Sequence, residues 1–142
     1  EYPEYDPSYA VIQGPYTATF NDYVRQELKY ESDLPYEILT GKVWPWNYES
    51  HQNEFVNVAE TLRQAMTVNP HLKVYVANGY YDLATPFLAT EYTFNHIGLD
   101  STLLENITMH YYEAGHMMYA HLPSLAQMKV DMDGFLETAV PD

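Results

Sequence analysis

The sequence predicts an α/β fold in which parallel strands alternate with flanking helices. Three observations predict it. Leu72–Asn78 and Ile107–Tyr112 are short, apolar segments rich in β-branched and aromatic residues, which is typical of strands. A helical pattern at 86–97 separates them, and another begins near Pro123 after the second. The order strand, helix, strand, helix indicates a parallel sheet, because parallel strands need a crossover connection.

The first part of the chain predicts helix and loop. Residues 1–13 are rich in Tyr and Pro and are expected to be irregular. From Gly14 and Pro15 onward, apolar residues recur at the three- and four-residue spacing of a helix. These residues are Tyr16, Phe20, Tyr23, Val24 and Leu28. Segment 31–50 contains helix and strand breakers, Pro35, Gly41 and Pro45, and is expected to be a loop with short turns.

Three further helices are predicted from spacing and end signals. The first spans roughly 51–68, and its expected buried stripe is Phe55, Ala59, Leu62 and Met66. The crossover helix has Thr85 and Pro86 as N-cap and first turn, and Gly98 as its C-terminal stop. The last helix carries its apolar residues on one side: Leu125, Met128, Met132, Phe135 and Leu136.

Composition limits the partners and the chemistry. The 142 residues form a single region, with a lead-in helix and loop at 1–50 and the α/β part at 51–142. The net charge of −14, with only six Lys and Arg, opposes binding to nucleic acid or to an anionic membrane surface. No apolar run approaches the ~20 residues that span a bilayer. The chain contains no cysteine, so disulfides, thiolate metal sites and a cysteine nucleophile are excluded.

Asp82 and His116 are the candidate catalytic pair. Asp82 follows the first strand within NGYYDLATP, and His116 follows the second strand within YEAGHMMY. Loops after neighbouring parallel strands emerge at the same sheet edge, and the strands are only ~5 Å apart, so we expect the two side chains to meet. A carboxylate that accepts one imidazole N–H fixes the tautomer and leaves the other nitrogen free to act as a base.

These segments resemble a known family. LKVYVANGYYDLATPFLATEY and ITMHYYEAGHMMY are similar to the acid and histidine segments of the serine carboxypeptidases in their bacterial form. The upstream stretch YDPSYAVIQGPYTATFNDYVRQELKY resembles the segment that precedes them, so the resemblance covers nearly the whole chain. It implies an α/β-hydrolase fold, no cofactor, and a secreted or periplasmic location. It further implies that Asp82 and His116 are two members of a catalytic triad, and that Met117 lines the pocket for the departing C-terminal residue.

The nucleophile of that family is missing. The serines are Ser8, Ser32, Ser50, Ser101 and Ser124, and none has the G-x-S-x-G setting of a nucleophile elbow. We therefore expect the C-terminal fragment of a larger hydrolase, with an incomplete sheet and no peptidase activity of its own. Peptides would be substrates of the complete enzyme only. A missing N-terminal portion, or a second copy of the chain, would cover the exposed sheet, because parallel sheets are normally buried on both faces.

Other interpretations stay open. The chain could belong to another α/β-hydrolase, such as an esterase or an aminopeptidase-like enzyme, or it could be a non-catalytic interaction module. Asp82 alone is consistent with a turn residue, His116 with a structural histidine, and Met117 with a core methionine. A metal site can be drawn from His110, Glu113, His116 and His121, but its spacing is not that of a helical metal motif, so no metal is predicted. Trp44 and Trp46 are expected to anchor their loop on the core.

Overall fold

The structure is a computed structural model, and it describes residues 7–36 and 41–140. Parts of the predicted lead-in and loop, residues 1–6 and 37–40, lie outside the described residues. The chain divides into two compact units, residues 1–52 and residues 53–142. Within the part that the structure describes, no helix is both long enough and apolar enough for a bilayer span.

The first unit is built on one long helix, α1 (Pro7–Gln26). The prediction that residues 7–13 are irregular is therefore wrong, and Pro15 lies inside the helix instead of near its start. A proline removes one backbone hydrogen bond from a helix, but the turns on either side can still form. The predicted apolar stripe packs in part, since Phe20 contacts Tyr36 with 4.5 Å between ring centroids.

Two short 3-10 turns follow in the loop region, η1 (Gly41–Val43) and η2 (Glu49–His51). Trp44 and Trp46 lie between these turns, and their side chains are 70% and 57% exposed. The expectation that they anchor the loop on a core is therefore wrong.

The second unit holds a two-stranded parallel sheet, β1 (Val74–Gly79) and β2 (Ile107–Tyr112). The strands pair in register from Val74 opposite Ile107 to Gly79 opposite Tyr112. This confirms the predicted parallel pair. β2 has its predicted bounds, and β1 begins two residues later than expected. The crossover contains the expected helix α3 (Phe87–Asn95) and a short helix, α4 (Ser101–Leu104), that was not predicted.

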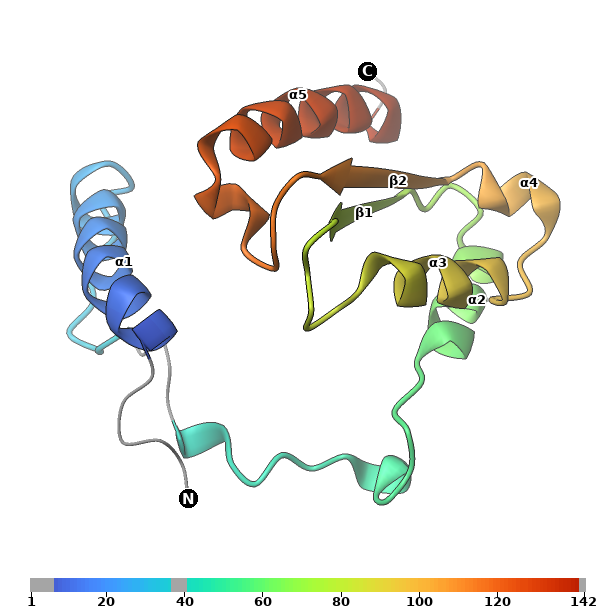
Figure 1. Cartoon of the computed structure of the whole chain (residues 1–142), viewed down its shortest axis with the longest axis horizontal. Helices are drawn as coiled ribbons and strands as arrows, with labels where there is room; N and C mark the ends of the chain where they lie inside the picture. The colour runs from blue at the N-terminus through green and yellow to red at the C-terminus, as the bar shows by residue number, and fades with distance from the viewer. Residues whose placement is uncertain (1–6, 37–40, 141–142) are drawn as a thin grey trace. The chain divides into compact units, whose positions relative to one another are not determined.

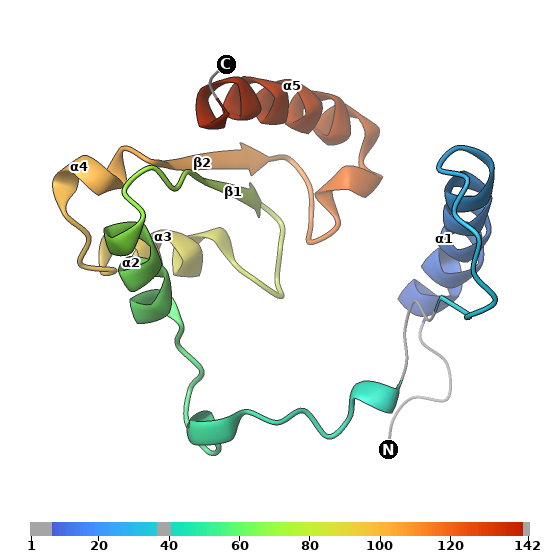
Figure 2. The ribbon, with the colours of Figure 1, turned by 180° about the vertical axis from the view of Figure 1, so that it is seen from behind.

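Helices lie on both faces of this sheet (Figures 1 and 2). α5 (Leu122–Ala139) covers one face, where Phe135 contacts Tyr75 of β1 at 5.3 Å between ring centroids. α3 covers the other face, where Phe87 contacts Tyr111 of β2 and Glu91 accepts a hydrogen bond from the Tyr111 hydroxyl. Because alternate residues of a strand point to opposite faces, each helix packs on one set of side chains.

The helix predicted at 51–68 is shorter than expected. α2 spans Ala59–Val68, and its Met66 side chain is fully buried as predicted. Phe55, expected in the same buried stripe, precedes the helix and is fully exposed. The amide oxygen of Asn57 accepts a hydrogen bond from the Ala59 backbone N–H, and this local contact favours a helix start at that point.

The core of the second unit is small and lies under the β2 end of the sheet. Tyr112, Ala114 and Met118 form the buried cluster, and Ala77 and Met128 pack against it. Tyr112 is the last residue of β2, Ala114 lies in the loop after it, and Met118 begins the turn η3 (Met118–Ala120). The loop that carries His116 is thus held by buried residues on both sides of the histidine.

Candidate active site

The site lies where the two strands end. The loops after β1 and β2 leave the same edge of the sheet, as Figure 1 shows. They are joined by backbone hydrogen bonds: the Tyr80 N–H donates to the Tyr112 carbonyl at 2.9 Å, and the Tyr81 N–H donates to the Ala114 carbonyl at 3.0 Å. These bonds hold the two loops side by side just before each reaches its candidate residue.

Gly79 makes this close approach possible. A Cβ atom at Gly79 would lie 2.5 Å from the Gly115 carbonyl oxygen and 2.6 Å from that of Ala114. Side-chain carbons do not approach oxygen so closely, so a larger residue would push the loops apart. Glycine at position 79 therefore allows contact between two loops. The residues next to it in the sequence do not show this, because the other loop is more than 30 residues away.

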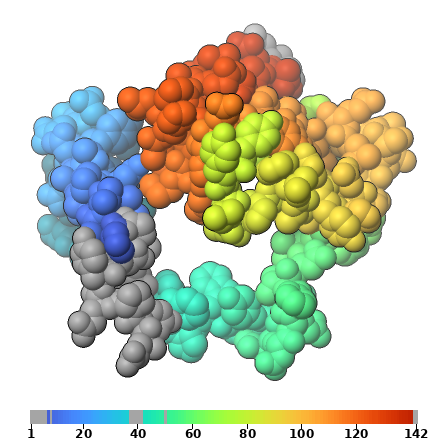
Figure 3. Space-filling model, in the orientation of Figure 1, coloured from blue at the N-terminus to red at the C-terminus, as the bar shows by residue number. Residues whose placement is uncertain are grey.

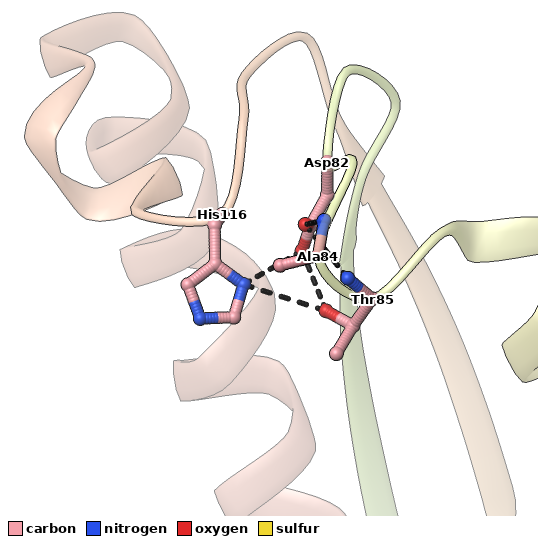
Figure 4. Close-up of polar contacts among 4 residues, drawn as sticks. All are labelled: Asp82, Ala84, Thr85 and His116. Atoms are coloured by element: carbon pink, nitrogen blue, oxygen red, sulfur yellow. Dashed lines mark hydrogen bonds and ion pairs between the residues drawn. The ribbon is translucent and has the colours of Figure 1, made fainter. Parts of the chain in front are cut away.

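Asp82 is buried and accepts four hydrogen bonds (Figure 4). Its Oδ1 accepts from the backbone N–H groups of Ala84 at 2.8 Å and Thr85 at 2.9 Å. Its Oδ2 accepts from the Thr85 hydroxyl at 2.6 Å and from Nδ1 of His116 at 2.9 Å. Asp82 thus forms a tight turn with its own loop and also binds the imidazole, so the turn-residue interpretation and the histidine-orienting one both describe it.

These donors keep Asp82 ionised. The hydroxyl of Thr85, followed by the Thr85 backbone N–H, is the main cause that lowers the pKa of Asp82 well below its usual range. Burial opposes the shift, while His116 and the Ala84 N–H add to it. A carboxylate that accepts several hydrogen bonds is stabilised in its charged form, as an imidazolium partner would require.

His116 presents one side of its ring to Asp82 and leaves the other side open. Its side chain is 63% exposed, and both of its contacts with described residues are made through Nδ1. In Figure 4 the second ring nitrogen points away from Asp82. The expected contact of Asp82 with His116 is therefore observed, and Nε2 is placed to exchange a proton with a group that approaches from solvent.

Met117 follows His116 directly and is partly buried, ahead of η3. Of the two adjacent methionines, Met118 is the buried one, and it belongs to the core cluster. The pocket role expected for Met117 stays a prediction.

The four residues that could be drawn as a metal site do not converge. His110 contacts Asp131 through Nδ1 at 3.3 Å, and His121 contacts the Ser124 hydroxyl at 2.8 Å, while His116 faces Asp82. Over residues 7–36 and 41–140, no group of three or more His, Cys, Asp or Glu side chains is arranged to hold a metal ion.

The N-cap role predicted for Thr85 is wrong. Pro86 occupies the N-cap position of α3 with no side-chain capping hydrogen bond, and the Thr85 hydroxyl donates to Asp82. The D-x-x-T spacing was the available signal, because a side chain three residues after an aspartate in a turn can reach its carboxylate.

Comparison of the chain with protein-family models, with curated proteins and with solved structures gave no match.

Proposed function

We propose that this chain supplies the acid and base residues of a serine-type carboxypeptidase with an α/β-hydrolase fold, and that the nucleophilic serine comes from a polypeptide segment outside it. The observation that carries the proposal is the 2.9 Å contact between the Asp82 Oδ2 and the His116 Nδ1 at the carboxyl edge of a parallel sheet, with the other ring nitrogen open. Ligand and catalytic sites of open α/β sheets lie at this edge.

The chemistry follows from the two roles of the ring. His116 Nε2 takes the proton of the serine hydroxyl as its oxygen attacks the scissile carbonyl, and the buried Asp82 stabilises the resulting imidazolium. The same nitrogen then gives that proton to the amine of the departing C-terminal residue, which leaves an ester on the serine. In the second half, Nε2 takes a proton from water, the hydroxide attacks the ester, and the proton returns to the serine.

The choice of carboxypeptidase over other serine hydrolases depends on the similarity of the segments around Asp82 and His116 to that family. Met117, next to the histidine, would line the pocket for the residue that leaves. An esterase or an aminopeptidase-like enzyme would use the same Asp–His pair but would not need to bind a terminal carboxylate.

A fluorophosphonate probe, which labels activated serines, tests the proposal on two polypeptides. The 142-residue chain alone should give no adduct. The chain extended by whatever its gene encodes ahead of Glu1 should be labelled on one serine and should release the C-terminal residue from an N-acylated dipeptide. His116→Ala in the extended polypeptide should lower kcat/KM by roughly 10⁴-fold or more.

Three results would contradict the proposal. Stoichiometric labelling of the chain alone would show that the nucleophile lies within it. Labelling of the extended polypeptide with hydrolysis of esters but not of peptide C-termini would indicate another hydrolase. A natural start codon at this position, with no labelling in any form, would favour an interaction module.

A further inference from the structure

We infer that Thr85 is a positioning residue of this site: its hydroxyl fixes the orientation of the Asp82 carboxylate and, through it, the Nδ1–H tautomer of His116. The geometry stands by itself, and its meaning for catalysis rests on the proposed function. The side chains of Asp82 and Thr85, on the loop after β1, and of His116, on the loop after β2, form one hydrogen-bonded cluster.

The protons of the cluster can be assigned from its distances. The Thr85 Oγ1 lies 2.6 Å from Asp82 Oδ2 and 3.4 Å from His116 Nδ1, and a hydroxyl has only one proton to donate. An ionised carboxylate can only accept hydrogen bonds, so the Thr85 hydroxyl donates its proton to Asp82 Oδ2 in the 2.6 Å contact. Nδ1 then lies 2.9 Å from Oδ2 and 3.4 Å from Oγ1, with both oxygens available only as acceptors. Nδ1 must therefore carry hydrogen, and in the neutral ring Nε2 is left as the base.

The two oxygens of Asp82 depend on different parts of Thr85. Oδ1 accepts from the backbone N–H groups of Ala84 and of residue 85. Any residue except proline at position 85 keeps both hydrogen bonds. Oδ2, which binds His116, is held within its own loop by the Thr85 hydroxyl. Loss of that hydroxyl should leave the turn intact and free the oxygen that faces the imidazole.

Capping does not account for the position of the hydroxyl. Pro86 is the N-cap of α3, and the helix has no side-chain capping hydrogen bond at this end. A threonine that served the helix would direct its oxygen to the N–H groups of that turn. Thr85 instead directs it to Asp82 and towards His116, across 31 residues of sequence.

The test replaces Thr85 in the 142-residue chain and observes the ring by ¹⁵N NMR at about pH 8.5, where an ordinary imidazole is neutral. The wild type should show hydrogen on Nδ1. Thr85→Val, which keeps the shape and removes the hydroxyl, should raise severalfold the fraction of rings with hydrogen on Nε2, the form that free imidazole prefers in water. It should also raise the pKa of Asp82, because the Thr85 hydroxyl is the largest of the contacts that lower it. Thr85→Ser should restore both readouts.

Thr93→Val is the matched control. Thr93 lies on α3, and its hydroxyl donates to the Ala89 carbonyl of the same helix at 2.9 Å. This change should leave the tautomer of His116 and the pKa of Asp82 as in the wild type. An unchanged tautomer and an unchanged Asp82 titration in Thr85→Val would overturn the inference, as would a Thr85→Ser variant that behaves like Thr85→Val.

The NMR readouts need no nucleophile, so they separate this inference from the proposed function. If the tautomer responds but no polypeptide containing this chain hydrolyses peptides, the positioning role stands and the carboxypeptidase proposal fails. In an active extended polypeptide, Thr85→Val should lower kcat with little effect on KM and should shift the acidic limb of the pH–rate profile, and Thr85→Ser should restore both. A loss confined to KM would overturn the positioning role.

Discussion

At the scale of single residues, Asp82 combines two functions that are often separate in proteins. One oxygen closes a turn with two backbone N–H groups, and the other faces an imidazole from the neighbouring loop. The turn places the carboxylate at a fixed point, so the histidine meets an oxygen that is already oriented. Oriented charge is useful in catalysis because no reorganisation is needed when the imidazolium forms.

The ionisation of Asp82 predicts how stability changes with pH. Its pKa in the folded chain is lowered, mainly by Thr85, so its contribution to the free energy of unfolding is fully present above the unfolded pKa of about 3.9 and is lost as pH falls towards the folded value. Asp82→Asn should be less stable than the wild type at pH 7, and the difference should narrow below about pH 4. Urea unfolding at several pH values measures it, and a difference that stays constant with pH would contradict the expectation.

Gly79 predicts a second effect at this scale. Gly79→Ala must separate the loops after β1 and β2, because the atoms that its Cβ would meet are backbone oxygens, which cannot rotate away. We expect a loss of about 1–3 kcal/mol in the free energy of unfolding, together with loss of the Asp82–His116 contact.

Gly134→Ala is the control for that change. Gly134 lies within α5, and nothing lies within 4 Å of the Cβ that alanine would add. Alanine there should leave stability unchanged or raise it by about 0.5–1 kcal/mol, because glycine is unfavourable inside helices. Equal effects of the two substitutions would show that the loops tolerate separation. Urea unfolding gives the energies, and the His116 ring signals report the contact.

At the scale of elements, a partly buried polar cluster links α5 to the sheet. The Tyr112 hydroxyl donates to Asp131 Oδ2 at 2.9 Å and also contacts the hydroxyl of Tyr75, while Gln127 donates to Asp131 Oδ1. His110 lies 3.3 Å from the same carboxylate and stacks on the Tyr75 ring. Burial raises the pKa of Tyr112 far above its usual range, and its two hydrogen bonds add to the effect, so the phenol stays a donor.

Asp131→Ala should therefore weaken the docking of α5. It leaves the buried Tyr112 hydroxyl without its carboxylate acceptor, which should cost about 1–3 kcal/mol in the free energy of unfolding. Asp133→Ala is the matched control on the same helix. Asp133 is exposed and, among the residues that the structure describes, pairs with Lys129 one turn earlier, so its loss should change stability by about 0.5 kcal/mol or less. Denaturant unfolding of both variants at pH 7 provides the measurement, and similar losses would contradict a structural role for the cluster.

The elements also show which features the sequence could predict. β2 was predicted with its observed bounds because a β-branched and aromatic run ends at Tyr112, before Glu113. Gly98 was correctly expected beyond the end of α3, where its φ of +70° needs glycine. Both signals are local. The meeting of Asp82 with His116 could also be predicted, since adjacent parallel strands bring their following loops together.

Other features depend on contacts that spacing does not report. Phe55 fits the periodicity of α2, yet the helix starts only where Asn57 accepts from a backbone N–H. By sequence the Thr85 hydroxyl suits a cap, in which its oxygen would accept from an N–H of the first turn of α3. In the structure it instead donates to the buried Asp82 carboxylate, a charge-assisted hydrogen bond. In both cases one side-chain hydrogen bond, invisible in the apolar pattern, decided the outcome.

At the scale of the whole molecule, exposed apolar side chains coexist with a large negative charge. Leu83 is 94% exposed, and Leu88 and Tyr92, one turn apart on α3, are 64% and 66% exposed. The loop after β1 and α3 form part of the surface in the space-filling view (Figure 3). Exposed apolar side chains favour association, whereas 20 acidic residues against six Lys and Arg oppose contact between like copies.

These two tendencies respond differently to salt, which gives the last prediction. At about 10 mM ionic strength the Debye length is ~30 Å and repulsion acts between whole chains, so sedimentation should show a monomer; at about 1 M it is ~3 Å, and the apolar surface should drive association. Leu83→Ser with Leu88→Ser should suppress the larger species, whereas Val68→Ser with Val130→Ser, which alters two other exposed side chains, should not. A chain that stays monomeric at both salt concentrations would show that these exposed side chains do not drive association, and it would contradict the prediction.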